Sequence, residues 1–149
     1  MKIGKRISLQ KNFFLDEFFP KETYLEKTQE EMEAMLDPTL PLICQKLRKI
    51  WGPMLINSWW YPEVTNPRNY AGWRPKNCTV GAKKSMHKEG RAVDPIFLNI
   101  SADEVRRAII ADNQRFFDMG IRRIENEVSW LHLDTKQVAR QKEIIFFNP

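Results

Sequence analysis

The chain has two histidines, and each lies in a segment whose residue types suit a metal ion. The first segment covers residues 85–94 and contains His87, and the second covers residues 129–134 and contains His132. With Asp94, they offer two imidazoles and one carboxylate. A catalytic zinc ion uses such a set of three protein ligands and keeps a fourth position open for water. His87, Asp94 and His132 are therefore the candidate ligands of a Zn²⁺ ion.

The elements around these residues have to bring them together. Gly90 separates His87 from Asp94, and glycine permits the backbone bend that would direct both side chains to one ion. Residues 93–97 are typical of a short strand, and His132 would arrive from a neighbouring strand.

The rest of the pattern predicts helices first and short strands later. The expected elements are a helical turn at 12–19, helices at 21–36, 39–51 and 102–119, and strands at 54–60, 93–97, 121–125, 128–134 and 143–147. Residues 61–84 contain three prolines, two glycines and three asparagines, which predicts a long loop. This order indicates an α+β fold with a small, mainly antiparallel sheet and flanking helices.

Length and composition favour one domain over residues 1–149, and we expect a monomer. The net charge of +5 suits a polyanionic partner, but the positive residues are dispersed, so we expect no nucleic-acid partner. Cys44 and Cys78 are far apart and are expected to be free thiols. No apolar run is long enough to span a bilayer, and the first residues lack the apolar core of a secretory signal. We therefore expect synthesis in the cytoplasm and no membrane insertion.

Both histidine segments resemble motifs of a known family. Residues 85–94 match SxHxxGxAxD, the signature of the M15 zinc peptidases, which include D-Ala-D-Ala carboxypeptidases and peptidoglycan endopeptidases. Residues 130–134, Trp-Leu-His-Leu-Asp, are similar to the second family motif, an aromatic-x-His-x-Asp strand that supplies the last zinc ligand. The zinc fold of hedgehog signalling domains is related, and the resemblance covers roughly residues 12–136.

The resemblance implies a hedgehog/DD-peptidase-like fold in which His87, Asp94 and His132 hold zinc. A zinc-activated water would then hydrolyse a bond in the stem peptide of bacterial peptidoglycan, as in a D,D-carboxypeptidase or an endolysin-type endopeptidase. Ser85 would shape the loop beside the substrate. Without a signal segment, a phage lysis enzyme or a virion-associated hydrolase, acting on the wall after release, fits this implication best.

The chain departs from the family at the position of the catalytic acid. Many relatives carry a carboxylate three residues before the last histidine, where this chain has Ser129. We favour Glu127 as the base, although a regular strand would point it away from the metal unless a bulge or turn intervenes. Asp134 shares a face with His132 and is the second candidate, with orientation of that imidazole as its other possible role. Glu125 is the third candidate.

A second departure concerns the substrate-binding arginine. Relatives often have Ser-Gly-Tyr-Arg after a strand, where this chain has Ser-Trp-Trp-Tyr. Arg68, Arg74 or Arg91 could substitute, or could be surface arginines. Trp59 and Trp60 could form an aromatic wall for the substrate, or could pack in the core. These two departures favour an alternative function, a catalytically silent zinc domain that binds a partner or a glycan.

Overall fold

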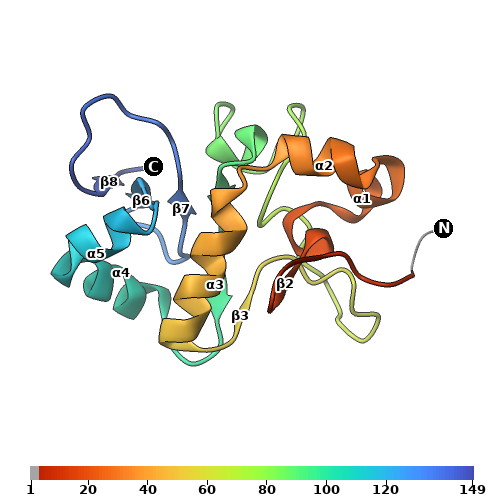
Figure 1. Ribbon diagram of the computed structural model, residues 1–149, viewed down its shortest axis with the longest axis horizontal. Coiled ribbons are helices and arrows are strands. Elements are labelled where there is room, and N and C mark those ends of the chain that lie inside the picture. The colour runs from red at the N-terminus through yellow and green to blue at the C-terminus, as the bar shows by residue number, and fades with distance from the viewer. Residues whose placement is uncertain (1–3) are drawn as a thin grey trace.

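The computed structural model describes residues 4–149, in which helices flank three small sheets (Figure 1). The helices are α1 (Lys21–Glu26), α2 (Gln29–Met35), α3 (Thr39–Trp51), α4 (Ala102–Ala111) and α5 (Asn113–Asp118), with 3-10 turns η1 (Leu15–Phe18) and η2 (Met86–Glu89). The strands are β1 (Ser8–Gln10), β2 (Phe13–Phe14), β3 (Met54–Leu55), β4 (Ala92–Val93), β5 (Ile96–Phe97), β6 (Arg123–Glu125), β7 (Leu133–Asp134) and β8 (Ile145–Phe147). The predicted α+β class is confirmed.

The largest sheet has the strand order β4-β7-β6-β8. Its β4–β7 and β7–β6 pairs are antiparallel, whereas β6 and β8 run parallel. The two smaller sheets, β1-β2 and β3-β5, are antiparallel, so the prediction of a mainly antiparallel arrangement is confirmed.

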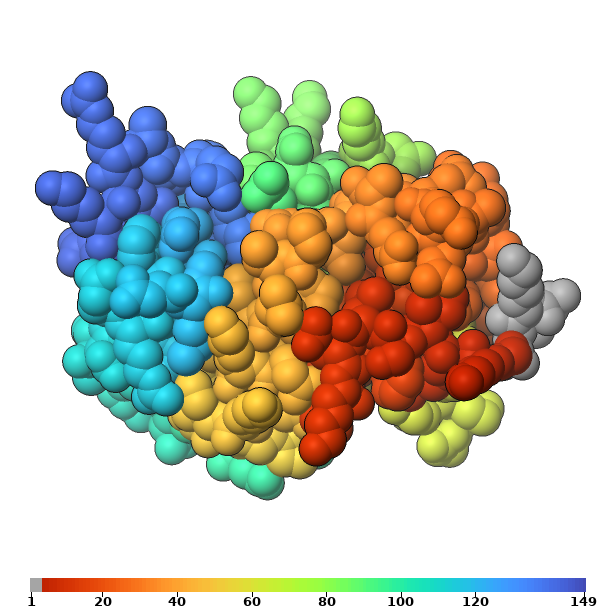
Figure 2. All heavy atoms as spheres, viewed as in Figure 1, coloured from red at the N-terminus to blue at the C-terminus, as the bar shows by residue number. Residues whose placement is uncertain are grey.

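Helix α3 supports both halves of the molecule. It lies between the N-terminal elements and the C-terminal elements (Figures 1 and 2). Leu40, Ile43 and Leu47 are fully buried, as the spacing of apolar residues over 39–51 predicts. Burying each such side chain stabilises the fold by roughly 1.5–3 kcal/mol. The same apolar cluster extends from Phe13 to Ile144, so the sheet and the helices share one core.

Two long helices predicted from the sequence are each divided in the structure. The helix predicted at 21–36 is interrupted because Thr28 is extended and caps α2, with its hydroxyl accepting from the Glu31 backbone N–H. The helix predicted at 102–119 is interrupted at Asp112, whose φ of −137° and ψ of 48° are not helical. Composition at 21–36 and apolar spacing at 102–119 identified the helical segments, but not the residues at which each helix is interrupted.

Most strands are shorter than predicted. The strand expected at 54–60 ends at Leu55, and the one expected at 128–134 contains only Leu133–Asp134. Pro95, which has no N–H to donate, separates β4 from β5 in the segment expected to be one strand. Residues 61–84 contain no helix or strand, as predicted.

Within residues 4–149, none of the helices combines the length and apolar character that a bilayer crossing requires.

The conformation of Gly90, in the loop before β4, requires a residue without a side chain. Its φ of +68° lies in the left-handed region, and a Cβ there would overlap the Met35 carbonyl oxygen. We expect Gly90→Ala to lower the free energy of unfolding by about 2 kcal/mol or more, measured by urea unfolding. Gly4→Ala is the control, since its Cβ would meet nothing within 4 Å. Equal midpoints for the two variants would contradict this account of Gly90.

Candidate metal centre

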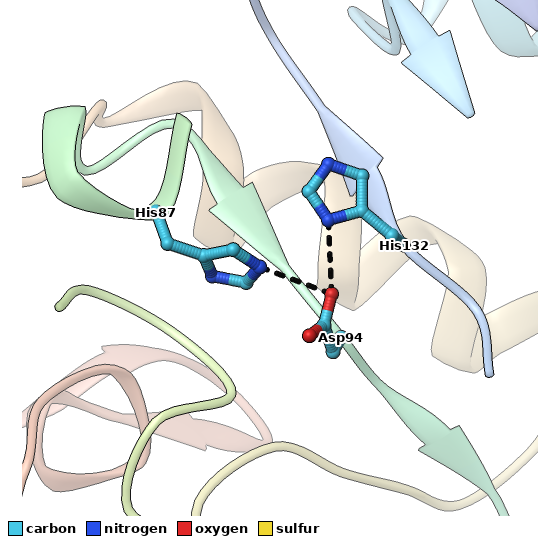
Figure 3. Close-up of side chains that lie close together, drawn as sticks. All are labelled: His87, Asp94 and His132. Carbon is cyan, nitrogen blue, oxygen red and sulfur yellow. Dashed lines mark hydrogen bonds and ion pairs between the residues drawn. The ribbon is translucent and has the colours of Figure 1, made fainter. Parts of the chain in front are cut away.

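His87, Asp94 and His132 converge from three different elements (Figure 3). His87 lies on η2, Asp94 directly follows β4, and His132 directly precedes β7. The Asp94 Oδ1 atom lies 3.1 Å from His87 Nε2 and 3.0 Å from His132 Nδ1. Ligand atoms of a tetrahedral zinc ion with bonds of about 2.0–2.1 Å lie roughly 3.3 Å apart. The donor set and its spacing therefore fit zinc.

The second nitrogen of His87 is already engaged. His87 Nδ1 lies 2.7 Å from the Gly72 carbonyl oxygen, which can only accept a hydrogen bond. Nδ1 therefore carries a proton, and the Nε2 lone pair of the neutral ring faces the centre. The side chain is buried, which keeps it in this orientation.

His132 is oriented by a buried carboxylate. Its Nε2 lies 3.1 Å from Asp134 Oδ2, so Nδ1 is the nitrogen that faces Asp94. Asp134 is fully buried and accepts hydrogen bonds from Arg123 Nε at 3.1 Å and Nη2 at 2.7 Å. A cavity opens beside His87, Asp94 and His132, and Asp134 is not among the residues that line it. The position of Asp134 therefore fits the orienting role better than that of a base.

Asp94 has one oxygen available to a metal because the other is engaged. Arg74 Nη2 donates to Asp94 Oδ2 at 3.1 Å, and its other donors bind the carbonyl oxygens of Tyr70 and Val80. Arg68 Nη2 donates to the Asp94 backbone oxygen at 2.6 Å. Both arginines line the cavity, but these hydrogen bonds hold the protein chain around the ligand.

The electrostatics of the centre favour a cation. Burial opposes ionisation of Asp94, but the hydrogen bond from His132 and the positive charge of that ring outweigh it and lower its pKa. Burial also disfavours the charged form of His132, yet hydrogen bonds to Asp134 and Asp94 raise its pKa to about 9. The pKa of His87 is lowered by burial. Without a metal, a proton on His132 therefore supplies the positive charge beside Asp94.

A cavity of about 660 Å³ opens beside the three ligands. Its walls come from the loop around residues 80–86, from the large sheet and from the C-terminal residues 147–149. Trp130, which is 50% exposed, and Phe147 are its aromatic lining residues. Ser85 also lines it, and its hydroxyl accepts a hydrogen bond from the His87 backbone N–H.

Strand register places Glu125 beside His132. Ile124 pairs with Leu133, so the next pair along β6 and β7 is Glu125 with His132. The Glu125 N–H donates to the His132 carbonyl oxygen at 3.2 Å, which agrees with this register. Directly paired residues project to the same face with Cβ atoms about 5 Å apart. Glu125 accordingly lines the cavity next to a metal ligand.

Glu127 lies elsewhere. It is exposed, adopts a φ of +57° in the turn that follows β6, and is not among the residues that line the cavity. A turn does interrupt the strand, as the expectation for Glu127 required, but the glutamate that lines the cavity is Glu125. Alternation along the strand from Arg123 gives Glu125 and Glu127 the same face, so the end of β6 at Glu125 decides between them.

Three other expected substrate residues lie away from the cavity. Trp59 is buried in the core, where its Nε1–H donates to the Phe19 carbonyl oxygen, and Trp60 packs against it. Core packing therefore accounts for both tryptophans. Arg91 pairs with Asp37.

Comparison with protein-family models, with curated proteins and with solved structures found no match.

Zinc binding at about pH 7.5 should release about one proton per ion. In the metal-free protein His132 is protonated at this pH, because its pKa of about 9 lies above it, whereas His87 is neutral. Since zinc must displace the proton on Nδ1, its affinity should rise about tenfold per pH unit as pH approaches 9 and then level off. Calorimetry in buffers of different ionisation enthalpy measures the proton count. Binding without proton release would contradict the assignment of His132.

Proposed function

We propose that the protein is a zinc-dependent peptidase that hydrolyses a peptide bond in bacterial peptidoglycan. The observation that carries the proposal is the convergence of His87, Asp94 and His132 at a cavity whose wall also presents a carboxylate. The substrate class comes from the two motifs that resemble M15 peptidases. A hedgehog/DD-peptidase-like fold, and action on the wall after release or from a virion, belong to the same proposal.

The chain's own residues support hydrolysis in distinct ways. His87 presents a neutral lone pair, His132 would present one once zinc displaces its Nδ1 proton, and Arg74 leaves Asp94 a single oxygen for the ion. Zinc bound there would polarise the peptide carbonyl and lower the pKa of a water molecule to about 7. Glu125 would accept a proton in the cavity and return it to the leaving amine.

We propose Glu125, rather than Glu127, as the base. Glu125 is partly buried beside His132, whereas Glu127 is exposed in a turn and does not line the cavity. A base must lie within reach of the water that it deprotonates, so position in the cavity decides between them. The stem peptide would lie along the wall formed by Trp130 and Phe147, where its apolar groups find exposed aromatic surface.

The alternative is a zinc domain that binds a partner or glycan without catalysis. The observation that favours it is at Ser129, which is exposed and carries no carboxylate at the position where many M15 relatives have their catalytic acid. The two functions predict different results when the cavity glutamate is replaced and zinc is retained. A peptidase would lose turnover, whereas a silent binding domain would have no turnover to lose.

Replacing Glu125 with Gln should reduce peptidoglycan hydrolysis by about 10²–10⁴-fold without loss of zinc, because the amide cannot accept the proton. Glu127→Gln is the matched control and should keep full activity. Released fragments are measured by mass spectrometry with a chelator control, and their masses identify the bond.

Full activity of Glu125→Gln would refute its role as the base. Zinc-loaded wild-type protein that releases no fragment from several wall chemistries would favour the silent binding domain.

A further inference from the structure

Phe147, on the last strand, contacts two groups of the metal centre. The Arg123 Cζ atom lies 4.1 Å from the centroid of its ring. The His132 ring lies edge-on to it, with centroids 5.7 Å apart and an interplanar angle of 85°. Backbone pairing fixes the position of Phe147, since it is in register with Glu125 and its carbonyl oxygen accepts from Asn126 N–H at 2.7 Å.

Arg123 connects this ring to a metal ligand by a second route. Its guanidinium donates to the buried carboxylate of Asp134, which in turn holds His132 Nε2. The Arg123 side chain is 18% exposed, so it has solvent on one side and depends on its neighbours to stay in place. The face of Phe147 attracts the guanidinium electrostatically and limits its movement away from Asp134.

The neighbouring residue on the same strand has a different environment. Phe146 is in register with Ile124 and packs against the hydrophobic core. Phe147 points to the opposite face, lines the metal cavity and is not part of that core. Core packing therefore accounts for Phe146. It does not account for Phe147, whose ring instead contacts Arg123 and His132.

We propose that Phe147 is a positioning residue for the metal centre. By keeping Arg123 against Asp134 and bracing the His132 ring, it aims the Nδ1 lone pair at the ion. Strand β8 thus completes a site whose ligands all precede it in the chain. The proposal rests on the proposed function only in requiring that the centre binds zinc.

The test compares full-length wild type with Phe147→Ala, Phe147→Leu and Phe147→Tyr, with Phe146→Ala as the matched control. Zinc affinity is measured by competition with a chromophoric chelator, ligand geometry by the visible spectrum of the Co²⁺-loaded protein, and folding by urea unfolding. Phe147→Ala should bind zinc about tenfold more weakly and alter the Co²⁺ spectrum. Phe147→Tyr should keep the wild-type zinc affinity and Co²⁺ spectrum because it keeps the aromatic face, whereas Phe147→Leu should not. Phe146→Ala should lose stability but keep the affinity and the spectrum.

Wild-type affinity and spectrum in Phe147→Ala would overturn the positioning role while leaving the proposed function intact. If Phe147→Leu kept the zinc affinity and the Co²⁺ spectrum as well as Phe147→Tyr does, the positioning role would also be overturned. This comparison holds even if the alanine variant fails to fold. Wild-type protein that binds no zinc would instead overturn the proposed function, and the positioning role with it.

Discussion

The candidate site and the chain around it depend on the interactions of one group, the carboxylate of Asp94. It is largely buried, and a buried charge is tolerated only where hydrogen bonds and opposite charges replace water. Two histidines share one of its oxygens and Arg74 binds the other. Because Arg74 also binds the carbonyl oxygens of Tyr70 and Val80, the same charge that attracts a cation also organises the long loop that walls the cavity.

Strand register places two of the candidate ligands and cavity-lining residues of β6 and β8 on one face of the large sheet. One face of the large sheet carries Val93, Leu133 and Ile124, which are fully buried in the core. The alternate residues on the opposite face, at the next position of each strand, are Asp94, His132, Glu125 and Phe147. A slip of one residue would move the apolar side chains into the cavity, so hydrophobic burial fixes the register that aligns the chemistry.

The sequence was sufficient for features with a strong local pattern and insufficient for those set by tertiary contacts. Helix 39–51 was predicted correctly because its apolar face is regular. The three residues that converge at the candidate metal centre could be named because the chain has only two histidines. Glu125 was ranked below Glu127 because the pattern does not show where β6 ends and the turn begins. The roles of Arg68 and Arg74 likewise depend on carbonyl oxygens brought together only by folding.

The charge balance of the candidate centre suits a divalent cation. In the metal-free protein, the protonated His132 ring lies between the carboxylates of Asp94 and Asp134, and its Nδ1 proton faces Asp94, where an ion would bind. A divalent ion in place of the Nδ1 proton would raise the charge of the site by one unit. This excess would favour an anionic ligand at the open position and would stabilise a nearby carboxylate, and Glu125 lies at such a position on the next strand.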